Sequence, residues 1–139
     1  MDAAQALADL TEISSQIEAA ALFDEEGRIA GSTLADETRS AELVRGAGEL
    51  LAAAEALRTS EGELTQLEVS TLAGSVFVVR DGPRRIVATT GPEPTVGLVF
   101  YDLKSCLRGV DDGGANGARR GGGKRRKKSE QGDGEDGAA

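Results

Sequence analysis

The stretch "LEVSTLAGSVFVVRDGPRRIVATT", residues 67–90, decides the fold class of this chain. Short runs of alternating apolar and polar residues, separated by "LAG" and "RDGPR", are typical of three consecutive strands. In the middle run, "SVFVV" at residues 75–79, both faces are largely apolar, which indicates a central strand covered on both sides. Asp81, Gly82 and Pro83 predict the turn before the third strand. The stretch therefore predicts the larger part of an antiparallel sheet.

The N-terminal third predicts a short helix followed by a hairpin. Apolar residues recur at helical spacing over residues 2–15, which indicates the helix. Residues 17–23 alternate as in a strand, and "RIAGST" at residues 28–33 returns as a second strand. Between the two strands, residues 24–27 have the composition of a turn, because Gly27 accepts a positive φ and the acidic residues are solvated.

A long helix is predicted between the hairpin and the three strands. Asp36 is the expected N-cap, and Glu37 suits the positive end of the helix dipole. One apolar stripe is formed by Leu43, Val44, Ala47, Leu50, Leu51, Ala54 and Leu57. A second face holds small residues four apart: Gly48, Ala52 and Ala56. Because Gly within a helix costs about 1 kcal/mol relative to Ala, we expect another helix to pack closely against this face.

"GPEP" at residues 91–94 ends the strands, and an amphipathic final helix follows. Its apolar positions are Val96, Val99, Phe100, Leu103, Leu107 and Val110. The order helix, two strands, helix, three strands, helix predicts an α+β domain over residues 1–110. We expect one five-stranded antiparallel sheet with the long helix on one face and the two terminal helices packed nearby. Residues 111–139 are rich in Gly and charge without apolar periodicity, which predicts a disordered tail.

Composition narrows the classes of function. Residues 1–110 hold 18 acidic and nine basic side chains, and residues 111–139 hold six acidic and seven basic ones. An acidic body is repelled by phosphate backbones, so no nucleic-acid partner is expected for it. Cys106 is the only cysteine, which excludes an intramolecular disulfide and favours a reducing, cytoplasmic location. No stretch has the roughly 20 apolar residues that a membrane helix needs, and no signal peptide is evident.

Candidate catalytic and metal-binding residues are few, because the chain contains no His. Without His, neither Cys106 nor a serine has an activating base, and Cys106 is expected to serve packing. Residues 24–26 are adjacent carboxylates in a turn and lack further oxygen ligands for a metal. No phosphate loop and no paired buried carboxylates are evident, so we expect no enzyme, no cofactor and no metal. In the turn "DGPRR", Arg84 or Arg85 could reach a nucleotide on a partner, as an arginine finger does.

Residues 4–108 resemble the Roadblock family, which includes Roadblock dynein light chains and bacterial MglB-like proteins. The resemblance rests on the acidic turn closed by Gly27, the three-strand run, and a final helix entered through Pro94 with Gly97 and Leu98. It implies dimers, homodimers or heterodimers, in which the long helices pair across a two-fold axis and the sheets join edge to edge. The pairing residues would be Gly48, Ala52 and Ala56 on the helix, with Leu67, Val69 and Thr71 at the sheet edge.

The same resemblance implies a non-enzymatic platform that binds a Ras-like small GTPase, and some bacterial members stimulate GTP hydrolysis by their partner. On this chain the expected contact residues are Glu42, Arg45 and Glu49, which lie off the apolar stripe. Two alternatives remain open. One is a structural scaffold or adaptor without a GTPase partner. The other is a PAS-like small-molecule sensor, for which the chain has few aromatic residues to line a pocket.

A basic run in the tail is conspicuous: Arg119, Arg120, Lys124, Arg125, Arg126, Lys127 and Lys128. It has no interleaved aromatic residue, which argues against base stacking. The run is either a solvated segment, offset by "SEQGDGED" or by the chain's own acidic domain, or a contact for an acidic surface of a partner, a nucleic acid or an anionic membrane.

Overall fold

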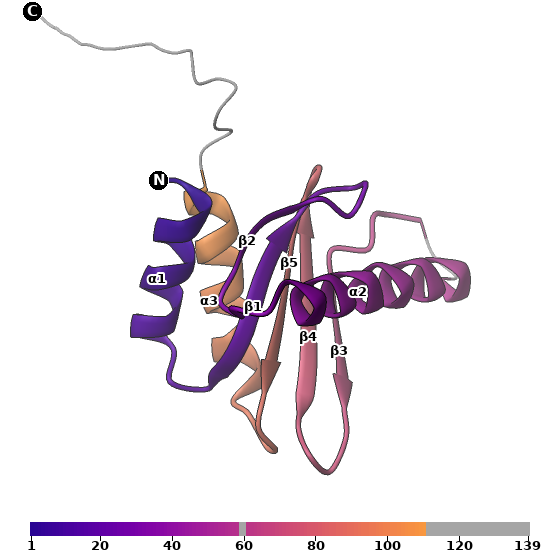
Figure 1. Cartoon of the computed structure of the whole chain (residues 1–139). Helices are drawn as coiled ribbons and strands as arrows, with labels where there is room; N and C mark the ends of the chain where they lie inside the picture. Colours follow the sequence, from indigo (N-terminus) through magenta and orange to yellow (C-terminus); the bar gives the residue numbers. More distant parts are fainter. Residues whose placement is uncertain (59–60, 111–139) are drawn as a thin grey trace, which may run out of the picture. The chain divides into compact units, whose positions relative to one another are not determined.

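A computed structural model describes residues 1–58 and 61–110. Within these ranges the chain forms three helices and five strands (Figure 1). In chain order they are α1 (Ala3–Ile13), β1 (Ile17–Phe23), β2 (Ile29–Ser32), α2 (Glu37–Leu57), β3 (Gln66–Ser70), β4 (Ser75–Asp81), β5 (Arg84–Thr90) and α3 (Val96–Gly109). Met1 and residues 3–109 form one compact unit. The predicted tail, residues 111–139, lies outside the described residues.

The strands form one antiparallel sheet in the order β2-β1-β5-β4-β3. The prediction of three consecutive strands over residues 67–90 is confirmed, and β4 lies between β5 and β3. Phe77, Val78 and Val79 of β4 are all buried, so this strand is covered on both faces as its sequence predicts. The α+β class and the five-stranded sheet are therefore confirmed.

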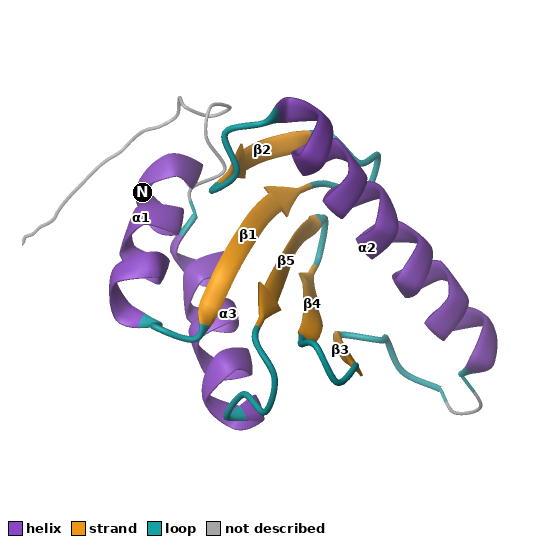
Figure 2. Cartoon of the chain, turned by 60° about the horizontal axis from the view of Figure 1, so that its bottom comes forward, coloured by secondary structure: helices purple, strands orange, loops and turns teal. Residues whose placement is uncertain are grey.

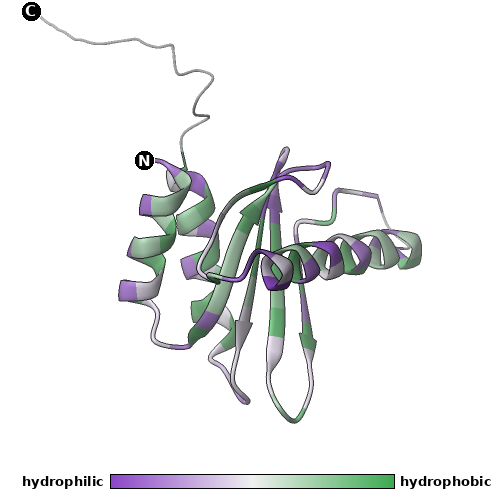
Figure 3. Cartoon of the chain, in the orientation of Figure 1, coloured by the Kyte–Doolittle hydropathy of each residue, from purple (hydrophilic) through white to green (hydrophobic). Residues whose placement is uncertain are grey.

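The helices form a layer on each side of the sheet (Figure 2). Helix α2 covers one face and contacts β1, β2 and β5. Helices α1 and α3 pack against each other on the opposite face, where α3 contacts β4 and β5. The sheet is largely hydrophobic, whereas the helices alternate polar and apolar stripes (Figure 3). The terminal helices thus form a separate layer on the face opposite α2.

Two cores result from this arrangement. On the α3 side, the ring of Phe77 meets the ring of Phe100 edge to face, with centroids 5.0 Å apart. Leu103 and Leu107 of α3 are fully buried there. On the α2 side, a cluster of buried residues consists of Ala21, Phe23, Val44, Ala47, Leu51, Val78 and Val87. Alternate strand residues serve the two cores because successive side chains point to opposite faces.

Two glycines are required by the turns that connect the strands. Gly27, in the turn between β1 and β2, has a φ of +84°, in the left-handed region that Gly adopts readily. Gly74, in the turn between β3 and β4, lies so close to β5 that an added Cβ would collide with the carbonyl oxygen of Thr90. These two turns fix the register of β1 with β2 and of β3 with β4.

Candidate binding surface around helix α2

Helix α2 is held by its N-terminus and by one apolar face. The side chain of Asp36 caps the helix by accepting hydrogen bonds from the amides of Thr38 and Arg39, at 2.8 and 3.3 Å. The face toward the sheet is buried and consists of Ser40, Val44, Ala47 and Leu51. The predicted cap is confirmed. Of the predicted apolar stripe, Val44, Ala47 and Leu51 are buried, whereas Leu43 and Leu50 are half-buried and Leu57 is exposed.

The outer ridge of α2, defined here as Glu42, Arg45 and Glu49, is exposed along its whole length. These are the three residues that the sequence predicts as partner contacts. No ion pair links them to one another or to other residues that the structure describes. The ridge therefore presents two acidic groups and one basic group that remain available for a partner.

On one side of the ridge lies the leucine flank, which consists of Leu43, Gly46, Leu50, Ala53 and Leu57. The leucines recur every seven residues with a small residue between them, a spacing typical of paired helices. Leu57 is 79% exposed, and Leu43 and Leu50 are half-buried. A hollow of about 410 Å³ beside this flank also contains Val76 of β4. The flank is therefore an apolar surface that borders the β4–β3 side of the sheet.

Strand β3 forms the sheet edge on that side. Among the described strands it pairs with β4 alone, and Val76 lies opposite Val69, which is 39% exposed. Leu67 is half-buried and packs against the core cluster beneath α2. Thr71 lies just beyond the end of the strand. It belongs to the following turn, where its amide donates to the carbonyl oxygen of Gly74 at 2.8 Å.

The small-residue face lies on the other flank of α2, toward the β1–β2 turn. Gly48 and Ala52 line a groove between α2 and the β1–β2 turn, and Ala56 is exposed. A Cβ added to Gly48 would meet no atom within 4 Å, so no close packing inside this chain requires that glycine. Gly48 and Ala52 thus face the β1–β2 turn, whereas Val76, which pairs with Val69, lies beside the leucine flank.

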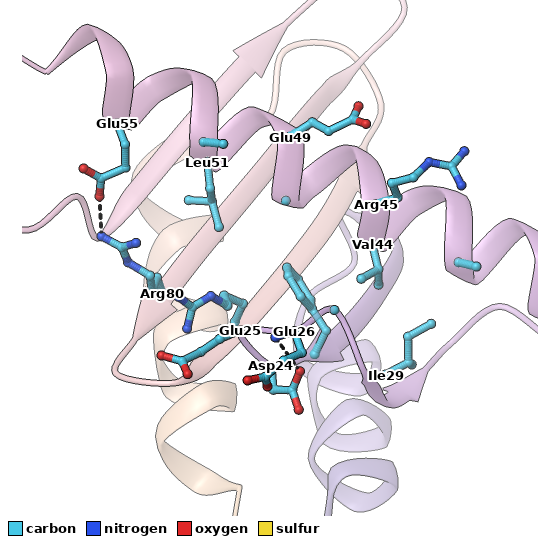
Figure 4. Close-up of a pocket in the computed structure, with 16 residues that line it drawn as sticks. Asp24, Glu25, Glu26, Ile29, Val44, Arg45, Glu49, Leu51, Glu55 and Arg80 are labelled. Carbon is cyan, nitrogen blue, oxygen red and sulfur yellow. Dashed lines mark hydrogen bonds and ion pairs between the residues drawn. The ribbon is translucent and has the colours of Figure 1, made fainter.

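The hairpin groove, as we call this cavity of about 570 Å³, has the β1–β2 turn on one side and α2 on the other (Figure 4). Its lining residues include five carboxylates and three guanidinium groups: Asp24, Glu25, Glu26, Glu49, Glu55, Arg45, Arg80 and Arg85. Arg45 and Glu49 lie on its α2 rim. The groove can hold a polar or charged group of a partner, but its lining offers no pair of nucleophile and base.

The turn residues of the groove are engaged with each other. Asp24 accepts hydrogen bonds at 2.9 Å from the amides of Glu26 and Arg28 and from the Arg28 guanidinium. The Arg28 side chain, together with these amides, lowers the pKa of Asp24 below its ordinary value. Among the described residues, no group of His, Cys, Asp or Glu is arranged to hold a metal ion. The carboxylates of the turn thus organise the hairpin.

An ion pair between Arg80 and Glu55 closes one end of the groove (Figure 4). The Arg80 side chain is 12% exposed, and its Nη2 lies 2.7 Å from a carboxylate oxygen of Glu55. This hydrogen bond is the main reason that the pKa of Glu55 lies below its ordinary value. The pair is not evident from the sequence, because its members are 25 residues apart and neither belongs to a recognisable motif.

The remaining candidates are placed as follows. Arg85 donates from Nη1 to the carbonyl oxygen of Gly82 at 2.7 Å, so its side chain is bound to its own turn. Cys106 is buried, and its Sγ donates to the carbonyl oxygen of Ala6 at 3.6 Å. The seven basic residues at positions 119–128 lie outside the described residues. In the part of the chain that the structure describes, no helix has both the length and the apolar character needed to cross a membrane.

Comparison with known proteins identifies the fold. The chain is similar to a Roadblock/LC7 domain from Streptomyces avermitilis, with a TM-score of 0.70 and 15% identity over 78% of this chain and 93% of that one. It is similar to Myxococcus xanthus MglB, with a TM-score of 0.59 and 18% identity over 72% of this chain and 84% of that one. An MglB with a tetrameric arrangement gives a TM-score of 0.60 and 15% identity over 78% and 84% of the two chains. No family model and no curated protein matches the sequence. The fold is therefore Roadblock-like.

Proposed function

We propose that this chain is a dimeric, cytoplasmic binding module that regulates or positions a Ras-like small GTPase and performs no catalysis of its own. The observation that carries the proposal is the Roadblock-like fold with an unobstructed outer ridge on α2. The resemblance to the Roadblock family implies the class of partner. The absence of His from the sequence and the lack of a nucleophile–base pair in the hairpin groove support a role in binding.

We assign the second copy of the dimer to the leucine flank and the β3 edge. Both surfaces are incomplete in a single chain, since Leu57 is 79% exposed and β3 pairs with β4 alone among the described strands. Burial of a leucine side chain contributes about 1.5–3 kcal/mol, and strand pairing would satisfy the backbone groups of the edge. The face formed by Gly48, Ala52 and Ala56 is the alternative pairing surface, on the opposite flank.

With the leucine flanks paired, the outer ridges of two α2 helices would lie side by side. Glu42, Arg45 and Glu49 of each copy would then form one continuous charged platform, and the hairpin groove would stay open beside it. Such a platform suits a partner surface with complementary charges, because charge complementarity governs specificity and association rate.

Affinity capture tests the proposal. The full chain and a variant with Glu42→Lys, Arg45→Glu and Glu49→Lys are each used to recover partners from native extract with GTP, GDP or no nucleotide. We expect a small GTPase that is enriched in one nucleotide state and is lost with the triple variant. Glu12→Lys, on an exposed position of α1, is the control that should retain the partner.

The outcomes separate the two leading functions. If only proteins that bind no nucleotide are recovered, and the triple variant releases them, the chain is the scaffold or adaptor that forms the alternative. If a GTPase is recovered equally with Glu42, Arg45 and Glu49 reversed, the outer ridge is not its site. Once the GTPase is known, its single-turnover GTP hydrolysis and its nucleotide release, with and without this chain, distinguish regulation from positioning.

A further inference from the structure

We propose that the groove between α1 and α3 is a docking site for an arginine on a peptide segment of a partner protein. This α1–α3 groove encloses about 340 Å³ and lies in the helical layer opposite α2, so the proposal is independent of the GTPase surface. Asp9 and Ile13 contribute to it from α1, and Tyr101, Asp102 and Cys106 contribute from α3.

Asp102 is the residue that carries the inference. It is only 8% exposed, yet it makes no hydrogen bond or ion pair with any residue that the structure describes. Its oxygens are not sealed from solvent, and the side chain lines the groove. A largely buried carboxylate that reaches solvent only through the groove depends on water there for its hydrogen bonds. A cationic group that enters the groove would supply the missing partner.

A second carboxylate makes the groove more electronegative. Asp9 lies on the α1 side, and neither Lys nor Arg is among the lining residues. Burial, with a further contribution from the negative charge of Asp9, raises the pKa of the Cys106 thiol to about 11. Met1 also lines the groove, and its amino group donates to the carbonyl oxygen of Gly109 at 3.3 Å, at the C-terminal end of α3. The carboxylates therefore favour a cation in the middle of the groove.

The apolar side of the groove specifies which cation fits. Ile13 is 72% exposed and Tyr101 is 64% exposed, so an apolar side chain and an aromatic ring stand beside the two carboxylates. A guanidinium group stacks on aromatic faces and binds carboxylates through a planar fork, and its aliphatic stem packs on apolar surface. The best fit is an arginine next to an apolar residue. The chain's own basic run, residues 118–128, contains no large apolar residue, which favours a segment of another protein.

The test uses the full chain labelled with ¹⁵N and the peptide acetyl-Leu-Arg-amide as probe. We expect saturable shifts of the amide signals of Asp9, Ile13, Tyr101 and Asp102. Acetyl-Leu-citrulline-amide, which keeps the shape but lacks the charge, should give no saturable shift. Asp102→Asn should weaken binding by at least about tenfold, the effect of losing one hydrogen bond to a charged group. Glu12→Gln removes an exposed carboxylate from the same helix as Asp9, outside the groove, and should bind like the unchanged protein.

A stability measurement distinguishes binding from a structural role. Because Asp102 has no partner in the free protein, Asp102→Asn should leave the melting temperature unchanged or raise it. The proposal is overturned if the citrulline peptide shifts the same signals with equal affinity, or if Asp102→Asn binds undiminished. A lower melting temperature for Asp102→Asn would also overturn it, because the carboxylate would then stabilise the fold itself.

Discussion

The two faces of the sheet are covered differently. Beneath α1 and α3, the strands contribute large side chains, such as Phe77 and Ile86, which are fully buried. Beneath α2, the adjacent positions Val78 and Val87 are smaller, and Ala21 is smaller still. Helices α1 and α3 together cover one face of the sheet. On the other face α2 lies alone among the described elements, with the leucine flank on one side of it and the hairpin groove on the other. The difference teaches that the two-helix face is the more fully packed, whereas apolar and charged surface stays accessible on the face of α2.

The largest expected effect is a loss of stability in the layer formed by α1 and α3. Leu103→Ala removes a fully buried side chain of α3 and should lower the free energy of unfolding by about 2–5 kcal/mol. Leu51→Ala is the matched change on α2, where the side chain is slightly exposed and borders the hairpin groove, so its loss should be smaller. Urea denaturation of both variants measures the difference. Equal losses of unfolding free energy in the two variants would show that the two layers do not differ in this way.

The next effect is a loss of dimerisation, and it tests the leucine flank of α2. Leu57→Glu places a charge on the leucine flank and should weaken dimerisation by at least about tenfold, because a buried unpaired charge is unfavourable. Its folding should be unaffected, since Leu57 is 79% exposed. Ala52→Glu, which introduces the same charge on the opposite flank, should leave the dimer intact. Sedimentation velocity over a range of concentrations measures assembly, with helix content from circular dichroism as the folding control.

Two other results of the sedimentation experiment would change the interpretation. Dissociation by Ala52→Glu alone would move the interface to the face formed by Gly48, Ala52 and Ala56. A chain that sediments as a monomer before any substitution would contradict the proposed dimer.

The smallest effect is the pH dependence of the ion pair that joins α2 to the end of β4. Because the pKa of Glu55 is lowered below its ordinary value of 4.5, chiefly by the hydrogen bond from Arg80, its contribution to stability is present above that pH. The contribution is lost as the pH falls through the lowered pKa. Glu55→Gln should therefore lower the denaturation midpoint at pH 7 and have no effect near pH 2. A partly exposed pair is screened by water, so the difference should be small.

Glu63→Gln is the control for that measurement. The Glu63 carboxylate lies 3.9 Å from Arg80 and is 65% exposed, so its replacement should change the midpoint less than Glu55→Gln at any pH. A pH-independent difference between Glu55→Gln and the unchanged protein would show that the loss comes from packing of the side chain and not from its charge.

Much of the fold is predictable because its signals are local. The alternation in residues 67–90, the cap at Asp36 and the turn closed by Gly27 each depend on residues close in sequence, and the structure contains all three elements. The ends of the helices differ by one or two residues, since α1 ends at Ile13 and α3 at Gly109. These differences leave the core faces unchanged.

The candidate sites depend on contacts that sequence spacing does not contain. A helical pattern separates the leucine flank from the small-residue face, but only the direction in which α2 crosses the sheet decides which one borders the β3 edge. Arg80 and Glu55 meet because β4 ends beneath α2. Asp102, a polar neighbour of Leu103, would be read as solvent-exposed, and it is buried because α1 packs beside α3. In each case a second element determines the environment of the residue.

The two edges of the sheet have a consequence for the size of the assembly. The β2 edge has only four residues, and its pairing with β1 is irregular at Leu22 and Phe23, whereas β3 is regular over its whole length. An assembly that joins two β3 edges about a two-fold axis uses the same edge of both copies and leaves only the short, irregular ones outside. Such an assembly is closed, so strand pairing does not continue into a filament.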